Sequence, residues 1–216
     1  MTYQGSEPHE GAQSDLVVNA ATRLFAALGY DGTTLHHIAE ASGLDLATLG
    51  TVAGSKRDIY LAVLDLAFRR HRAMLEESVR EFRETGSVHA LLERYLDFCL
   101  EYPDNLALWM HRWLADAVDV TDFEQRYVQP VIVVVGDLLR DSLARCDSDV
   151  DIDIEFSIWT VIWCAHGFVR GGFIGPDGLL RRASDPQTLR RFRRHMHRLW
   201  HRQLCLPGEP PAEYLL

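Results

Sequence analysis

The sequence predicts an all-α protein of about nine helices. Apolar residues recur at helical spacing in successive segments, and glycine or proline separates these segments. No pair of alternating segments around a tight turn indicates a β-hairpin. With 216 residues, 47% of them hydrophobic and 25% charged, the chain is long enough to bury a sizeable core in one or two domains.

The chain is expected to begin with one amphipathic helix followed by two short ones. The segment 14–28 carries a single apolar stripe, formed by Val17, Ala21, Leu24, Phe25 and Leu28 before the glycine at 29. Thr33 or Thr34 can cap a short helix over residues 35–41. Gly43 supplies the turn before a second short helix over residues 45–52.

Longer helices are expected in the rest of the chain. Ser55, with Asp58 three residues later, resembles a capping box and predicts a long helix that ends near residue 84. The next helices are expected over residues 88–101, 104–118, 122–145 with a kink at Pro130, and 152–172. Asp185 as cap and Pro186 at the first helical position begin a last helix that ends near residue 204. The stretch GGFIGPDG, residues 171–178, is expected to be a loop between helices.

The segment TLHHIAEASGLDLATLGTVA, residues 34–53, meets the requirements of a helix-turn-helix. Two short helices that cross tightly need a small residue at their contact, a glycine in the turn and apolar residues that face a supporting helix. Ala39, Gly43, and the apolar Ile38, Leu44, Leu49 and Val52 supply these features in that order. A helix pair without a DNA-binding function is the alternative.

Two nearby stretches, AATRLFAALGYDGTTLHHIAEASGLDLATL and SKRDIYLAVL, resemble the N-terminal domain of the TetR family of transcriptional regulators over residues 15–65. The rest of the chain is similar in outline, with a long connecting helix and two long helices at the end. The resemblance implies a homodimer. Each subunit would join a small DNA-binding domain to a larger ligand-binding helical domain.

Two positions depart from the family pattern. Gly50 stands where the family usually has a tyrosine that reaches phosphate, and Ala53 stands where it has a phenylalanine that packs against the first helices. Loss of a buried ring removes about 2 kcal/mol of burial, and a glycine in a helix costs about 1 kcal/mol. The DNA-binding domain is therefore expected to be looser than that of its relatives.

The partner implied by the resemblance is a double-stranded DNA operator. The residues expected to read bases through methyl and hydroxyl groups are Leu46, Ala47, Thr48 and Thr51, with Asp45 accepting from cytosine N4. The residues expected to hold phosphate are Thr34, Lys56 and, more strongly below about pH 6.5, His36 and His37. A solvated helix face is the alternative for each. Residues 14–60 contain three cations against five acids, so binding is expected to be weak and its salt dependence shallow.

Aromatic side chains on mostly apolar helices predict a site for a small-molecule effector. The candidate residues are Phe98, Tyr102, Trp109, His111, Trp113, Phe123, Trp159, Trp163 and His166. His111 and His166 are the polar members and are expected to hydrogen-bond the effector. Plain core packing is the alternative for the aromatic rings, and a satisfied core histidine is the alternative for the other two.

The last two helices carry the candidate dimer interface. Gly167 and Gly171 permit close helix approach. The last helix carries an apolar stripe of Leu189, Phe192, Met196, Leu199 and Trp200. The alternative is that this stripe is buried within one subunit.

Charge is distributed unevenly along the chain. Residues 1–180 hold 14 Lys and Arg against 28 Asp and Glu, whereas residues 181–216 hold 8 against 3. For the Arg-rich segment LRRFRRHMHRLWHRQ, pairing with acidic groups of the same subunit is favoured over nucleic-acid binding. His197 and His201 lie four residues apart and could hold Zn²⁺ with a third ligand. No such ligand is evident nearby, so surface histidines are favoured and no metal or other cofactor is expected.

The sequence thus predicts a ligand-responsive DNA-binding regulator, a repressor released from its operator by a small apolar or aromatic effector. No catalytic fingerprint is present and an enzyme is not expected. The four cysteines show no CxxC pair and no apolar run is long enough to span a membrane, which indicates a cytoplasmic protein. The expected division is a disordered arm at 1–13, a DNA-binding domain at 14–60, a ligand-binding and dimerisation domain at 61–206 and a tail at 207–216. The alternative is a TetR-like ligand-binding or protein-interaction module with reduced DNA binding.

Overall fold

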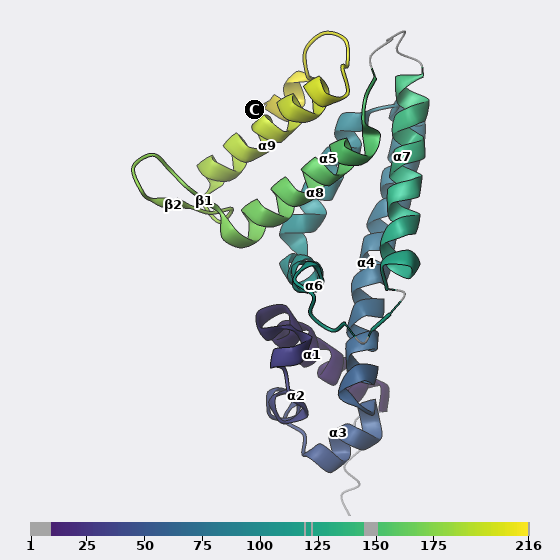
Figure 1. Ribbon diagram of the computed structural model, residues 1–216, viewed down its shortest axis with the longest axis vertical. Coiled ribbons are helices and arrows are strands. Elements are labelled where there is room, and N and C mark those ends of the chain that lie inside the picture. Colours follow the sequence, from purple (N-terminus) through teal and green to yellow (C-terminus); the bar gives the residue numbers. More distant parts are fainter. Residues whose placement is uncertain (1–9, 119, 122, 145–150, 216) are drawn as a thin grey trace, which may run out of the picture. The chain divides into compact units, whose positions relative to one another are not determined.

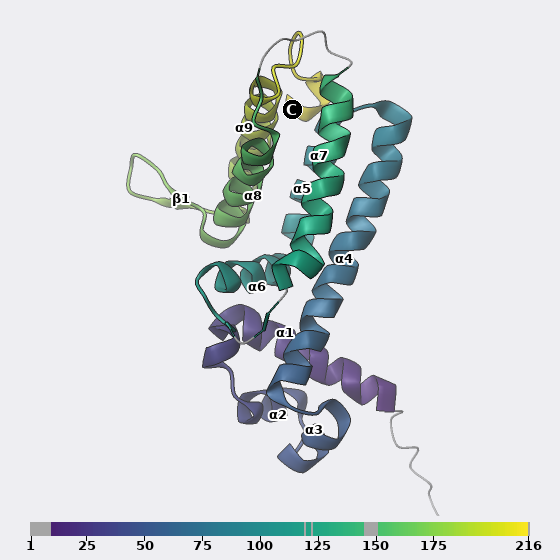
Figure 2. The ribbon, with the colours of Figure 1, turned by 45° about the vertical axis from the view of Figure 1, so that its right-hand side comes forward.

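The computed structural model describes residues 10–118, 120–121, 123–144 and 151–215 (Figures 1 and 2). Nine α-helices lie in these ranges, so the all-α expectation is confirmed apart from one short hairpin. The chain divides into two compact units. The N-terminal unit comprises Met1–Arg69 and Ala107–Asp119, and the C-terminal unit comprises Arg70–Leu106 and Val120–Leu216.

Local signals in the sequence set the ends of the N-terminal helices. The helices are α1 (Glu10–Gly32), α2 (Leu35–Ser42), α3 (Leu46–Ala53), the first part of α4 (Lys56–Thr85) and the second half of α6 (Pro103–Trp113). Gly29 breaks α1 with a φ of 75°, where the sequence predicts its end. Thr34 rather than Thr33 caps α2, and Gly43 ends it in the left-handed conformation. Ser55 and Asp58 form the predicted capping box of α4, because each side chain accepts the other residue's backbone N–H.

The described part of the C-terminal unit is built mainly from five long helical segments. Its elements are the rest of α4, α5 (Val88–Glu101), the start of α6, the π-helix η1 (Glu124–Val128), α7 (Gln129–Leu143), α8 (Ile154–Gly171), β1 (Phe173–Ile174), β2 (Leu180–Arg181), α9 (Pro186–Gln203) and the 3₁₀ helix η2 (Ala212–Leu215). Asp185 caps α9 with Pro186 at its start, as predicted. No helix in the described ranges is both long and apolar enough to cross a membrane.

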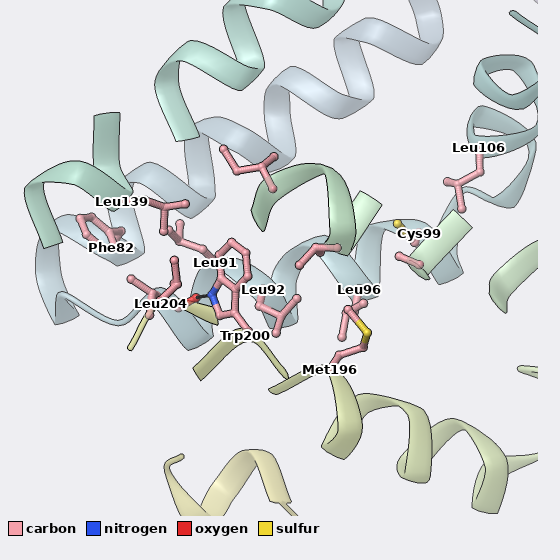
Figure 3. Packing of buried hydrophobic residues seen from close by; sticks show 14 residues of the cluster. Phe82, Leu91, Leu92, Leu96, Cys99, Leu106, Leu139, Met196, Trp200 and Leu204 are labelled. Carbon is pink, nitrogen blue, oxygen red and sulfur yellow. Dashed lines mark hydrogen bonds between the residues drawn. The ribbon is translucent and has the colours of Figure 1, made fainter. Parts of the chain in front are cut away.

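A core of aliphatic and aromatic side chains joins α5, α8 and α9 within this unit (Figure 3). Leu92 and Leu96 of α5 meet Met196 and Trp200 of α9 there, and all four are at most 4% exposed. The indole N–H of Trp200 donates to the backbone oxygen of Val88 at 3.2 Å. The apolar stripe of α9 therefore fills the core of its own subunit at these two positions.

Two helix boundaries differ from the prediction. Helix α6 ends at Trp113 rather than near residue 118, because Ala115 and Ala117 have positive φ. The Arg112 guanidinium donates to the backbone oxygen of Ala117 and helps to hold this turn. A π-helical turn precedes Pro130 in place of a simple kink, since a proline has no N–H to donate to the preceding turn. The predicted ends at 122 and 145 lie outside the described residues.

The segment 171–178 is not a plain loop. Phe173 pairs with Arg181 and Ile174 with Leu180 in an antiparallel hairpin, so the expectation of no hairpin was wrong. The turn between the strands closes through the N–H of Gly178 donating to the oxygen of Gly175. Only two pairs form, which is too short a run for the alternating pattern by which hairpins are predicted.

Candidate nucleic-acid interface and effector site

The helix-turn-helix predicted at residues 34–53 is present as α2 and α3. Ile38 and Ala39 on α2 and Leu49 on α3 are buried, and they hold the pair against α1. The turn closes when Leu44 N–H donates to the Ala39 oxygen at 3.0 Å. The small residue, the turn glycine and the buried apolar positions therefore lie where the helix-turn-helix prediction requires them. In this arrangement α3 is the second helix of the pair.

Three rings fill the core behind the helix pair. Phe25 and Tyr30 of α1 pack on Tyr60 of α4, with ring centroids 5.0 and 4.7 Å from the Tyr60 ring. All three residues are at most 8% exposed. These rings come from α1 and α4, so the core of the N-terminal unit has aromatic filling although position 53 is an alanine.

Several side chains predicted to contact DNA also cap their own helices. Asp45 accepts from the backbone N–H and the hydroxyl of Thr48, and these bonds hold the pKa of the Asp45 carboxyl below its usual value. His37 and Thr34 form a capping box, in which each accepts the other's backbone N–H. The Thr51 hydroxyl donates to the Ala47 oxygen. Capping holds the Asp45 carboxylate at the start of α3. Because the hydroxyls of Thr48 and Thr51 are hydrogen-bonded within α3 or to its cap, their methyl groups remain as apolar contact groups.

The outer face of α3 is small and apolar. Leu46 is 42% exposed, and Ala47, Gly50 and Thr51 are exposed as well. A Cβ built on Gly50 would meet no atom within 4 Å, so this position opens to solvent. His36 on α2 is also exposed. The predicted base-reading residues thus lie on or beside one accessible helix, with room for a larger side chain at position 50.

Lys56 is engaged inside the N-terminal unit. Its ammonium donates to the backbone oxygens of Tyr30 at 2.9 Å and Thr33 at 3.0 Å, and it lies 4.2 Å from the centroid of the Tyr30 ring. These contacts tie the start of α4 to the turn between α1 and α2. The role of Lys56 as a phosphate contact stays a prediction, and the structure gives this residue a second role that the sequence did not suggest.

The turn after α6 fastens α1 within the same unit. The Asp116 carboxylate accepts from the backbone N–H of Tyr30 at 2.6 Å and of Asp31 at 2.9 Å. His111 contacts the backbone oxygen of Ala26 at 3.2 Å. Gly29 fits beneath this carboxylate, since a Cβ there would lie 3.1 Å from it. No pattern in the sequence predicted that Asp116 meets α1, because the two positions are 86 residues apart.

The nine candidate effector residues are divided between the two units. Trp109, His111 and Trp113 belong to the N-terminal unit, where His111 bonds to α1 and Trp113 is 42% exposed. The other six belong to the C-terminal unit: Phe98, Tyr102, Phe123, Trp159, Trp163 and His166. Phe98, Phe123 and His166 are buried, whereas Trp163 is 49% exposed.

A smaller polar cluster forms around His166. The Tyr95 hydroxyl and His166 Nε2 lie 2.9 Å apart, and the His71 ring of α4 stacks on Phe98 at 5.1 Å. Burial lowers the pKa of both histidines to about 4, with positive charge on His71 contributing at His166. The buried Nδ1 of His71 has no hydrogen-bond partner. Two neutral imidazoles and a phenol thus lie together among aromatic rings of the C-terminal unit.

His71 was missed in the sequence. It lies in the polar run FRRHRAML, where nothing marks it as an inward-facing residue. Its partners are more than twenty residues away in the chain, so only the packing of α4 on α5 brings them together.

The candidate dimer residues fall into two groups. Met196 and Trp200 are buried in their own subunit, and the ring of Phe192 stacks on Phe168 of α8 at 4.0 Å. Leu189 and Leu199 are partly buried. Gly167 and Gly171 are exposed on α8, the former on the same face as exposed Trp163. The accessible apolar surface of this region therefore lies on α8 more than on the stripe of α9.

His197 and His201 are buried rather than on the surface, which corrects the expectation for this pair. Arg193 of the same helix pairs with Glu93 and Asp97 of α5, as expected for the Arg-rich segment. Cys99, Cys164 and Cys205 are free thiols, and Cys146 lies outside the described residues.

Comparisons with known proteins agree with this geometry. Residues 17–63 match the model of the bacterial regulatory proteins of the tetR family. No curated protein matches the sequence. Among solved structures, HlyIIR, a hemolysin II transcriptional regulator, is 15% identical with a TM-score of 0.60, covering 73% of this chain and 87% of its own.

Two further structures share the fold. The TetR family regulator PfmR from Thermus thermophilus is 18% identical with a TM-score of 0.57, covering 71% of this chain and 83% of its own. GusR from Salmonella enterica is also 18% identical with a TM-score of 0.58, covering 91% of this chain and 99% of its own. Residues 17–63 therefore match the N-terminal domain of the tetR family of bacterial regulatory proteins, and the chain shares its fold with solved regulators of that family.

Proposed function

We propose that the protein is a homodimeric cytoplasmic repressor that a small apolar or aromatic effector releases from a DNA operator. The observation that carries this proposal is the α2–α3 pair, which is packed as a helix-turn-helix and leaves the outer face of α3 accessible. A gel shift with DNA from beside the protein's own gene tests it. A specific shift supports the regulator, and failure to shift that DNA supports the alternative given below.

DNA binding by this domain is expected to be electrostatically weak. Residues 14–60 contain only Arg23, Lys56 and Arg57 as Lys or Arg. Lys56 is committed to backbone oxygens, while Arg23 and Arg57 are exposed. Because each phosphate neutralised releases about one counterion, the dependence of the binding constant on salt should be shallow.

Gly50→Arg should strengthen DNA binding and make its salt dependence steeper. The position is open to solvent on α3, so the guanidinium can reach phosphate without displacing a neighbour. One added contact in each subunit steepens the log–log salt slope by about two counterions per dimer. Gly50→Gln is the matched control, since it gives the same gain in helix propensity without the charge. Equal slopes for the two variants would contradict a phosphate-facing position 50.

The effector is proposed to bind the cluster of His71, Tyr95 and His166. Both histidines are neutral at pH 7 because burial lowers their pKa to about 4, and the surrounding rings offer an apolar wall. Neutral imidazoles donate and accept hydrogen bonds without attracting a charged group. A hydroxylated aromatic compound or a similar neutral molecule fits this chemistry.

The homodimer is proposed to form through the exposed face of α8. Phe156 is 64% and Trp163 49% exposed, and their rings lie 6.5 Å apart. Gly167 continues this face by one helical turn, and Ile174 of the hairpin is 65% exposed. Large apolar side chains gathered on one helix face are typical of a protein interface.

Trp163→Glu should convert the dimer to single subunits. A carboxylate at the centre of the α8 face would lose its hydration on association, which costs more than an apolar contact returns. Sedimentation equilibrium at micromolar concentration is the measurement, and Trp113→Glu, at the exposed tryptophan of α6, is the control. A dimer that survives Trp163→Glu places the interface elsewhere.

The proposed mechanism is a shift between two states of the dimer. Two recognition helices must lie about 34 Å apart, one duplex turn, to enter successive major grooves. An effector that binds more tightly to a dimer state with another spacing increases the population of that state, and the dimer dissociates from the operator. Helix α4 is the proposed lever, because it carries Lys56 and Tyr60 of the N-terminal unit and His71 of the effector cluster on one continuous helix.

The alternative is a TetR-like ligand-binding or protein-interaction module with reduced DNA binding. Two observations favour this alternative. Lys56 donates to backbone carbonyl oxygens inside the N-terminal unit, and the Asp45 carboxylate lies at the start of α3. Such a module would bind effector with the same affinity in the presence and absence of the upstream DNA, because no coupling would exist between the two ligands.

A further inference from the structure

Three buried histidines form an unbroken chain of contacts in the C-terminal unit. Glu93 Oε2 lies 2.8 Å from His197 Nε2, and His197 Nδ1 lies 3.0 Å from His89 Nδ1. The other nitrogen of His89 lies 3.1 Å from His201 Nδ1, and His201 Nε2 lies 3.0 Å from the backbone oxygen of Gly208. The three rings are at most 7% exposed.

Both ends of this histidine chain accept protons and cannot give them. Glu93 contributes a carboxylate oxygen. Burial raises the pKa of this carboxyl, but hydrogen bonding from His197 and the charge of Arg193 outweigh it, so the pKa is lowered overall. Gly208 contributes a carbonyl oxygen. Each of the four contacts needs one proton, yet three neutral imidazoles carry only three N–H groups. Whatever the tautomers, three neutral rings leave one contact with two facing lone pairs.

We propose that the three rings share four protons at neutral pH. The extra proton completes the hydrogen bonds that link the segment around Gly208 to α5 and α9. With His197 as the charged ring, its two N–H groups reach Glu93 and His89, and His89 donates to His201. His201 then donates to Gly208. Every contact has one proton, and the positive charge lies beside the Glu93 carboxylate.

The surroundings of His89 agree with a neutral middle ring. Burial lowers the pKa of His89 to about 4, and a proton on a neighbouring histidine lowers it further, so His89 stays neutral and donates one hydrogen bond while accepting another. The extra proton therefore belongs to an outer ring, and the outer ring beside Glu93 has the ion-pair partner.

The other groups around the histidine chain are consistent with one positive charge. Arg193 of α9 pairs with Glu93 and with Asp97, which removes part of the negative charge of α5. Tyr214 of η2 stacks on His197 at 4.5 Å and on His89 at 5.6 Å, and an aromatic face attracts a cationic ring. The further charges that act on Tyr214 are those of Glu81 and Glu213.

A metal ion does not account for this arrangement. His197 and His201 face opposite nitrogens of the His89 ring, so one nitrogen from each residue does not meet at a common point. Among the residues that the structure describes, no group of three His, Cys, Asp or Glu side chains could hold a metal. The three histidines are instead linked in series, as a proton-holding chain requires.

The direct test counts the protons on the rings. Two-bond ¹H–¹⁵N spectra of the full chain labelled in histidine distinguish rings with one protonated nitrogen from rings with two. At pH 7.5 we expect His197 to carry two protonated nitrogens, and His89 and His201 to carry one each. Three rings with one protonated nitrogen each would overturn the proposal.

Glu93→Gln removes the need for the extra proton, since the glutamine amide can itself donate to His197 Nε2. In this variant all three rings should be neutral at pH 7.5. Asp97→Asn is the matched control, because it also takes one carboxylate from Arg193 but leaves the histidine chain intact. The same doubly protonated ring in Glu93→Gln as in the unchanged protein would contradict the account.

Stability gives a second readout with a definite sign. Unfolded histidines lose their charge near pH 6.5, so above that pH the folded state holds one more proton than the unfolded state. The unfolding equilibrium constant should then rise by up to about tenfold per pH unit between about pH 7 and pH 9. Asp97→Asn should keep this rise, and Glu93→Gln should lack it. Identical pH dependences in the two variants would overturn the proposal.

Discussion

Trp200→Ala is expected to lower the free energy of unfolding by about 3–5 kcal/mol, the largest effect of any single change considered. Trp200 is 4% exposed in the core between α5 and α9, and its N–H donates to the Val88 oxygen. Truncation removes the ring from this core and leaves a buried carbonyl without its donor. Urea unfolding followed by circular dichroism measures the loss.

Two comparisons sharpen this prediction. Trp200→Phe keeps most of the ring and loses only the N–H, so it should cost about 1–3 kcal/mol. Because Trp200 packs inside its own subunit, Trp200→Ala should not weaken the dimer specifically. A variant that unfolds normally but dissociates into single subunits would show that the α9 stripe lies between subunits after all.

Asp116→Ala is expected to weaken DNA binding by tenfold or more. The Asp116 carboxylate holds the backbone N–H groups of Tyr30 and Asp31 just after the break in α1, and a charged hydrogen bond is worth about 1.5–3 kcal/mol. Without it, the turn that precedes α2 loses its anchor, so the helix-turn-helix is held less firmly. Fluorescence anisotropy with the upstream duplex measures the change.

The control for Asp116→Ala is Asp31→Ala. This change removes one negative charge from the same exposed turn and leaves the Asp31 N–H in place to bond Asp116. Asp116→Asn, which keeps one oxygen acceptor, should fall between the two. If Asp31→Ala and Asp116→Ala changed DNA affinity equally and in the same direction, the effect would be one of charge alone.

The sequence predicted those parts of the fold that local signals control. Gly29, Gly43, Asp185 and Pro186 begin or end helices where the pattern placed them. Capping and glycine preferences act over one helical turn, so a single sequence reveals them. The helix-turn-helix was predictable for the same reason, because its small, glycine and apolar positions all lie within twenty residues.

The sequence did not predict features that depend on distant residues. His89 meets His197 across 108 positions, and Asp116 meets Tyr30 across 86. The apolar stripe on α9 could be recognised in the sequence. Such a stripe does not show whether residues of the same subunit or of another subunit pack against it. For the candidate site, the sequence allowed individual histidines to be named as candidates. It could not show which groups each histidine contacts, because those contacts depend on how α4, α5 and α8 pack.

The most direct test of the central claim is the salt dependence of binding to the duplex upstream of the gene. A TetR-type reader with Arg23 and Arg57 as its exposed cations should prefer that duplex to a scrambled one. Its log–log salt slope should have a magnitude of about 4 or less for the dimer. Equal binding of both duplexes at low salt would contradict the proposal that α2 and α3 form an operator-reading pair.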